Sequence, residues 1–174
     1  PSTIYATNRL TSEHYCHIYN EVYNIDTNVF RITNCYGPRE QFLTPEKNAI
    51  NYLIYQAYRG KEFSIYNKGE FIRDFIYVDD VVQGLLQIMN KGQPGNLYWL
   101  GSGTKVWFYE FAKILNELTK TKFKYVNSPD YTKKVDVGNI VIDNSKLRQL
   151  NWKPKISLRD GINLTLDYFS KNNL

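Results

Sequence analysis

Two short apolar segments, each followed by residues that end a strand, constrain the fold of this chain more than its composition does. The first spans 28–33 and runs into Asn-Cys-Tyr-Gly-Pro at 34–38, where glycine and proline stop a strand. The second spans 71–78 and runs into Asp79-Asp80, a pair typical of a helix start. Strands that alternate with helical segments in this way predict an α/β protein.

The rest of the chain continues this alternation. Pro45 suits the first turn of a helix and Gly60 suits its end, while Asp79 or Asp80 is expected to cap the next helix. Apolar periodicity predicts helices at 5–21, 45–59, 79–90, 107–118, 145–150 and from 157 onward, and strands at 63–67 and 96–100.

Composition narrows the class of protein. The 174 residues are 43% hydrophobic and 16% aromatic, which argues against disorder along the whole chain. No apolar run approaches the ~20 residues of a membrane-spanning helix and no leader pattern is evident, so we expect a cytoplasmic protein without a membrane partner. Cys16 and Cys35, like His14 and His17, lack metal-site spacing, so we expect no metal.

The charge favours an anionic partner without naming it. A net charge of +5 and a pI near 9.1 suit a nucleotide diphosphate and suit nucleic acid equally well. No nucleic-acid-binding motif accompanies the lysines, so we expect no nucleic-acid partner and keep a basic nucleic-acid-interacting domain as an alternative. The run Gly-Ser-Gly at 101–103 is too short for a dinucleotide cradle, so this chain alone is predicted to bind NAD poorly.

Tyr5 and Arg9 lie four residues apart at the start of a predicted helix, which places both side chains on one face. A free phenol has a pKa near ~10, so a neighbouring cation makes it a better base near neutral pH. Taken alone, the pair is more often simply an aromatic residue and a cation that share an exposed helix face.

Several ordered motifs together resemble one known family. They are the Tyr5–Arg9 helix, the turn at 34–38, the strand led by Arg73, the run Lys-Lys-Val-Asp at 133–136 and the segment 143–154. This order resembles the carboxyl-terminal half of the NAD-dependent epimerase/dehydratase family, the extended short-chain dehydrogenase/reductases that modify nucleotide sugars. The resemblance covers essentially the whole chain.

The resemblance implies a domain organisation. Residues 1–38 would be the tail of a Rossmann-type domain, with the catalytic helix and the following strand. Residues 39–174 would form mainly the smaller, mixed α/β nucleotide-sugar-binding domain, with some segments returning to the Rossmann sheet. We expect an amino-terminal NAD-binding half upstream of these residues, and we expect this chain alone to be inactive.

The resemblance also assigns catalytic and cofactor residues. Tyr5 would be the acid/base, and Arg9 stands where the family has the lysine that holds the nicotinamide ribose. Arginine keeps the charge but hydrogen-bonds differently, so the replacement is not conservative. Tyr5, Arg9 and Tyr36 would contact NAD, and the choice between NAD and NADP stays open.

Three further residues would bind the nucleotide-diphosphate sugar. Asn34 would hydrogen-bond the substrate, and Arg73 would bind its pyrophosphate, since a guanidinium can engage two phosphate oxygens at once. Lys133 stands where the family has an arginine and would be a second pyrophosphate ligand. The structural alternatives are an ordinary turn at 34–38, an Arg73–Asp74 pair on an edge strand, and a solvated Lys133.

The resemblance points to a nucleotide-sugar epimerase or 4,6-dehydratase, the latter through the segment 41–47. Decarboxylation and reduction stay open, as do the base and the sugar. Family members form dimers through a bundle that uses the catalytic helix, so a homodimer is expected. A non-catalytic nucleotide-sugar binding module is the main alternative, and Arg9 is the residue in its favour.

Overall fold

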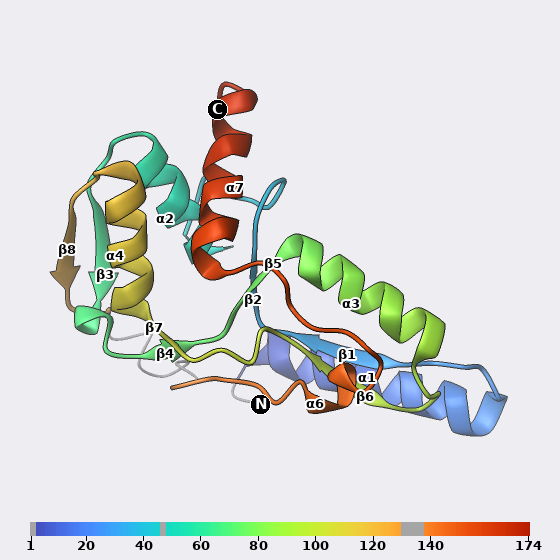
Figure 1. Cartoon of the computed structure of the whole chain (residues 1–174). Helices are drawn as coiled ribbons and strands as arrows, with labels where there is room; N and C mark the ends of the chain where they lie inside the picture. The colour runs from blue at the N-terminus through green and yellow to red at the C-terminus, as the bar shows by residue number, and fades with distance from the viewer. Residues whose placement is uncertain (1–2, 46–47, 130–137) are drawn as a thin grey trace.

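The computed structural model describes residues 3–45, 48–129 and 138–174 (Figure 1). The helices are α1 (Ile4–Tyr23), α2 (Ala49–Tyr58), α3 (Val78–Lys91), α4 (Phe108–Thr119), α6 (Ser145–Arg148) and α7 (Leu158–Lys171), with a short 3-10 turn η1 (Asn67–Gly69). The strands are β1 (Val29–Ile32), β2 (Asn34–Tyr36), β3 (Phe63–Tyr66), β4 (Ile72–Arg73), β5 (Phe75–Tyr77), β6 (Leu97–Leu100), β7 (Val106–Trp107) and β8 (Phe123–Val126).

The strands pair across long stretches of sequence. β1 pairs with β6, β2 with β5 and β3 with β8, all in parallel, while β4 pairs with β7 in the antiparallel direction. The two strands that flank the turn at 67–69 therefore pair elsewhere rather than with each other. This mixed architecture with parallel pairs confirms the predicted α/β class.

The larger core lies among α2, α4 and α7, which gather at one end of the molecule with β3 and β8 beside α4 (Figure 1). Phe111 is fully buried and stacks on Phe75, with ring centroids 5.5 Å apart. Each large apolar side chain buried in this way contributes about 1.5–3 kcal/mol to stability. Other members of this core with almost no exposed surface are Ile54, Ala112, Leu115, Ile162 and Phe169.

A second core lies between α3 and the strands β5 and β6. Gly84 lets α3 approach closely, because a side chain there would collide with Leu100. Trp152 closes this core and donates from its indole nitrogen to the carbonyl of Asp80 at 3.2 Å. The carboxyl-terminal segment therefore fastens α3 to the sheet.

Two predicted helix starts were wrong. Pro45 precedes α2 rather than entering it, because the Asn48 side chain caps the helix by accepting from the backbone N–H of Asn51 at 3.0 Å. Asp79 and Asp80 lie inside α3, whose cap residue Tyr77 makes no side-chain capping bond. Asp80 instead accepts hydrogen bonds from the backbone of Lys155 and Ile156, each at 3.0 Å. The predicted end of α2 is confirmed at Arg59, just before Gly60.

Helix α1 differs from the others, because none of its residues is buried. A bidentate ion pair attaches it to β1: Arg31 donates to the two carboxylate oxygens of Glu13 at 2.8 and 2.7 Å. Thr27 also donates to the carbonyl of Cys16 at 2.6 Å. Within the described ranges, no helix is both long and apolar enough to cross a membrane.

Candidate functional site

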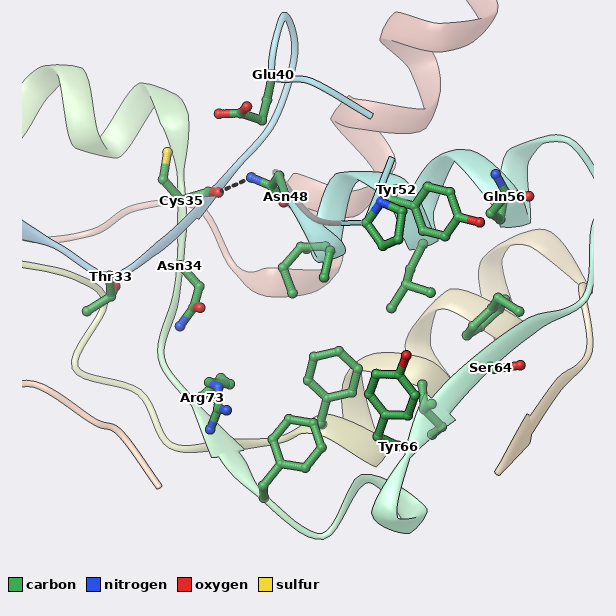
Figure 2. A pocket seen from close by; sticks show the side chains of 18 of the residues that line it. Thr33, Asn34, Cys35, Glu40, Asn48, Tyr52, Gln56, Ser64, Tyr66 and Arg73 are labelled. Carbon is green, nitrogen blue, oxygen red and sulfur yellow. Dashed lines mark hydrogen bonds between the residues drawn. The ribbon is translucent and has the colours of Figure 1, made fainter. Parts of the chain in front are cut away.

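A cavity of about 880 Å³ opens between α2, β3 and the strand ends around β2 and β4. It brings together three of the predicted site residues, Tyr5, Asn34 and Arg73. Figure 2 shows Asn34 and Arg73 on the same side of this cavity, with side chains of α2 and β3 across from them. Residues from three separate parts of the sequence therefore converge on one space.

Asn34 begins β2 and is held by its neighbour in β5. Its backbone N–H donates to the carbonyl of Asp74 at 3.3 Å, and its side-chain Nδ2 donates to the same carbonyl at 3.0 Å. The Oδ1 atom of Asn34 accepts no hydrogen bond from the residues that the structure describes. The side chain is thus fixed in place while one acceptor stays available to a ligand.

Arg73 lies on β4, opposite Val106 of β7. One guanidinium nitrogen donates to the carbonyls of Ile72 at 2.9 Å and Gly138 at 2.5 Å. The guanidinium also lies over the Phe71 ring, with its central carbon 4.7 Å from the ring centroid. Backbone and aromatic contacts therefore hold this cation against the cavity wall.

Asp74 does not form an ion pair with Arg73, which was the structural alternative to a ligand-binding role for Arg73. Its carboxylate is fully buried and accepts from the backbone N–H groups of Ser102 and Gly103, both at 2.9 Å, and from the Ser102 hydroxyl at 2.7 Å. The loop at 101–103 thus binds a carboxylate of its own chain. These backbone donors are occupied, which explains why the loop is unsuited to cradle a phosphate.

The opposite wall of the cavity is aromatic and polar, and the sequence reading missed it. Tyr52 and Gln56 come from α2, while Ser64 and Tyr66 come from β3 (Figure 2). Aromatic faces of this kind pack well against flat, unsaturated rings. The alternation of β3, whose odd-numbered residues are buried and whose even-numbered residues are exposed, was the signal available in the sequence.

A second cavity, of about 740 Å³, lies between α1 and β1. Arg9 lines this cavity, and its guanidinium carbon lies 5.2 Å from the centroid of the Tyr5 ring. Tyr5 and Ile32 line both cavities. The predicted face shared by Tyr5 and Arg9 is therefore present, and Tyr5 stands where the two cavities meet.

Tyr36 points away from both cavities. Its side chain is 1% exposed, its hydroxyl donates to the carbonyl of Leu158 at 3.3 Å, and its ring meets Tyr77 edge-on at 5.6 Å. Burial, with a smaller effect from Tyr77, raises the pKa of this phenol. The Tyr36 side chain serves the core and offers no exposed surface for the predicted cofactor contact. Lys133 lies outside the described residues.

The sequence model of the NAD dependent epimerase/dehydratase family matches residues 1–101, and this chain belongs to that family. The human dTDP-D-glucose 4,6-dehydratase is 28% identical over 177 residues, which cover 99% of this chain and 49% of that protein. A dTDP-glucose 4,6-dehydratase of Escherichia coli is 30% identical over 188 residues, covering 99% of this chain and 49% of that enzyme.

Solved structures agree with this assignment. The UDP-glucose 4-epimerase of Thermotoga maritima, crystallised with UDP-glucose, superposes with a TM-score of 0.86 at 30% identity, covering 95% of this chain and 52% of that one. A dTDP-glucose 4,6-dehydratase of Streptomyces venezuelae with NAD bound gives a TM-score of 0.84 at 25% identity, covering 99% and 52% of the two chains. The expected Rossmann-type, extended short-chain dehydrogenase/reductase fold is confirmed. The chain spans about half the length of these relatives.

Proposed function

We propose that this chain supplies the nucleotide-sugar cavity and the acid/base tyrosine of an NAD-dependent nucleotide-sugar epimerase or 4,6-dehydratase. The observation that carries the proposal is the convergence of Tyr5, Asn34 and Arg73 on one cavity. Its volume, about 880 Å³, lies within the range of small-molecule sites, about 300–1,000 Å³. The activities named for the relatives support the same class of substrate.

The walls suit the two ends of a nucleotide sugar. Arg73 would bind the pyrophosphate, because a guanidinium gives charge-assisted hydrogen bonds to phosphate oxygens. The Oδ1 atom of Asn34 would accept from a hydroxyl of the ligand. Tyr52 and Tyr66 on the opposite wall would pack against the base, with Gln56 and Ser64 as polar partners. Lys133 remains our candidate for a second pyrophosphate ligand.

Tyr5 would exchange the proton of the reacting sugar hydroxyl. Tyr5 lies where the substrate cavity meets the cavity lined by Arg9. One side of its side chain would therefore contact the sugar and the other side the cofactor. The Arg9 guanidinium lies over this ring, with its central carbon 5.2 Å from the ring centroid, and would contact the cofactor beside Tyr5. NAD, held in part by Tyr5 and Arg9, would supply reversible hydride-transfer chemistry at this place.

The described residues fit only one end of that cofactor. Tyr5 and Arg9 offer a hydroxyl and a cation to a nicotinamide ribose, whereas the backbone donors of the 101–103 loop are taken by Asp74. The pyrophosphate of NAD would therefore need residues other than those described. This agrees with a larger enzyme in which residues 1–38 end the Rossmann domain, residues 39–174 mainly bind substrate, and the exposed face of α1 joins two copies.

Calorimetric titration of the purified chain with UDP-glucose and dTDP-glucose tests the binding function. We expect measurable affinity for at least one of them and none for glucose, because glucose has no phosphate oxygens for the Arg73 cation to bind. The same chain given NAD should show no turnover. Absence of binding to both nucleotide sugars would contradict the proposal, and turnover by this chain would contradict the division of labour.

A second function, a non-catalytic nucleotide-sugar binding module, is favoured by one observation. Arg9 lies over the Tyr5 ring rather than presenting the ammonium of the family's lysine. In the native protein, Arg9→Lys would separate the two functions. If the protein is an enzyme, its turnover rate should differ measurably between the wild type and Arg9→Lys. If it is a binding module, neither form should show turnover.

A further inference from the structure

The junction between β4 and β5 holds a fully buried carboxylate, that of Asp74. Its Oδ1 accepts from the N–H and the hydroxyl of Ser102, at 2.9 and 2.7 Å. Its Oδ2 accepts from the N–H of Gly103 at 2.9 Å and from the N–H of Ile142 at 3.4 Å. Four donors from two separate segments thus converge on one side chain.

These donors compensate the burial of the charge. Within 3–45, 48–129 and 138–174, no ion pair includes Asp74, and an isolated buried carboxylate is costly. Successive backbone N–H groups beside a residue in the left-handed region form a concave anion site, and Gly103 has φ +71°. Gly101 brings this loop close to the start of β2, since a Cβ there would lie 2.6 Å from the Thr33 hydroxyl. The loop and the carboxylate therefore form one packed unit.

This unit is connected directly to the cavity. The carbonyl of Asp74 accepts both hydrogen bonds that hold Asn34, at 3.3 Å from its backbone and 3.0 Å from its side chain. Arg73 is the residue before Asp74, and its side chain lies on the same side of the cavity as Asn34 (Figure 2). Asn34 is thus held directly by Asp74, and Arg73 is connected to the same anchored residue through the backbone of the β4–β5 junction.

We propose that Asp74 is a positioning residue for this cavity: its buried carboxylate, clamped by Ser102 and Gly103, orients Asn34 and Arg73 together toward the nucleotide sugar. The inference rests on the proposed function of the cavity. Asp74 does not touch the ligand; it lowers the entropy that Asn34 and Arg73 lose when they bind, which is the usual benefit of preorganisation. A loop that looks like a shortened phosphate cradle thereby contributes to phosphate binding indirectly.

Ser102→Ala tests this because it removes the hydroxyl bond to Asp74, together with the bond that this hydroxyl accepts from the Thr104 N–H at 3.0 Å, and leaves both backbone donors to Asp74. We expect the Kd for UDP-glucose, measured by calorimetry, to rise about fivefold. The matched control is Thr119→Ala at the end of α4, away from the cavity, whose hydroxyl likewise donates one bond, to the Leu115 carbonyl at 2.8 Å, and accepts one, from the Thr121 N–H at 3.2 Å. The control should lower stability by a similar amount and leave the Kd unchanged.

A double-mutant cycle with Arg73→Ala separates positioning from general loosening. If Asp74 acts through Arg73, Ser102→Ala should cost less than half as much affinity in the Arg73→Ala background as in the wild type. A full additive loss there, an unchanged Kd in Ser102→Ala alone, or an equal loss in Thr119→Ala would each overturn the positioning role. An unchanged Kd in Arg73→Ala would overturn the proposed function itself, so the two failures are distinguishable.

Discussion

The two ends of this molecule are built differently. Around α2, α4 and α7, aromatic and aliphatic side chains form a closed core that backs one wall of the cavity. At the other end, α1 has no buried residue and is attached to β1 mainly through the Glu13–Arg31 ion pair. The proposed substrate residues Asn34 and Arg73 are half-buried on β2 and β4, and other residues of β2 and the neighbouring β5 belong to that core, whereas the proposed acid/base Tyr5 is 68% exposed on α1.

This contrast suggests that ligand binding and catalysis depend on different parts of the molecule. A binding wall supported by a packed core needs no further partner to keep its shape, because interdigitated side chains hold their rotamers. A catalytic residue on a helix without buried contacts lacks that support. The chain should therefore bind a nucleotide sugar by itself and yet fail to position Tyr5 for turnover.

The largest expected difference between the two ends is in stability. Phe111→Ala removes a fully buried ring and should lower the free energy of unfolding by about 3–5 kcal/mol. Val22→Ala on α1, where the side chain is 66% exposed, should change it by less than about 0.5 kcal/mol. Urea unfolding of both variants measures the contrast, and similar losses would show that α1 is as firmly packed as the core.

The second-largest expected effect is on ligand affinity, which should depend on Arg73 but not on an exposed arginine elsewhere. Arg73→Ala removes a charged donor from the cavity and should weaken UDP-glucose binding by about 1.5–3 kcal/mol, or roughly 10- to 150-fold. Arg59→Ala removes an equal charge at the exposed end of α2, where the guanidinium contacts the ring and hydroxyl of Tyr55. Calorimetry should find its affinity unchanged. If both variants lose affinity equally, general electrostatic attraction and not a specific site explains the binding.

Buried acids in the packed part should make the chain sensitive to alkali. Burial raises the pKa of Tyr77 to about 12 and that of Cys35 to about 11, so the folded state retains these protons when the unfolded chain has released them. Their contribution to stability is complete below about pH 9 and is lost as the pH rises through about 11 to 12. Tyr77→Phe should recover on the order of 1 kcal/mol of that loss.

Unfolding of wild type and Tyr77→Phe, followed from pH 8 to pH 11.5, measures this effect. Tyr125→Phe is the control, since that ring is 52% exposed. Parallel pH profiles for the wild type and Tyr77→Phe would mean that the Tyr77 phenol ionises as readily in the folded chain as in the unfolded one.

The smallest effect is expected at the attachment of α1. Glu13→Gln breaks a partly exposed bidentate ion pair and should cost less than about 1 kcal/mol of global stability. Because burial contacts are lacking there, amide hydrogen exchange in α1 should nevertheless become faster while exchange in α4 stays unchanged. The Arg31 neighbour, chiefly by hydrogen bonding, holds the pKa of Glu13 below its usual value, so protonation of Glu13 in acid should lower the protection of the α1 amides relative to their intrinsic exchange rates. Uniform acceleration in both helices would argue against a separate, loosely held α1.

Much of the fold was readable because local signals agreed with the final packing. The periodic segments became α1, α2, α3, α4 and α7, and the alternating segment at 63–67 became β3. The failures occurred where distant contacts overrode local rules. Asp80 was predicted to cap a helix, but its carboxylate accepts hydrogen bonds from the backbone of Lys155 and Ile156, more than seventy residues away. The sequences of strands β7 and β8 show no clear strand signal. These strands form because β4 pairs with β7 and β3 pairs with β8.

The site was readable only in part, for similar reasons. Motif spacing predicted Tyr5, Asn34 and Arg73, which share one cavity. Nothing in the sequence showed that Tyr36 turns into the core, because a turn motif does not state which way its side chain points. The role of Asp74 depends on donors 28 to 68 residues further along the chain, and no local pattern contains that information.

The packed part of this chain should by itself form a nucleotide-sugar site. Titration of the ¹⁵N-labelled chain with UDP-glucose, followed by NMR, tests this property. We predict saturable shifts at Asn34, the Arg73 side chain and Tyr66, with α1 beyond Tyr5 largely unaffected. No shifts at millimolar ligand, or shifts confined to α1 and β1, would contradict it.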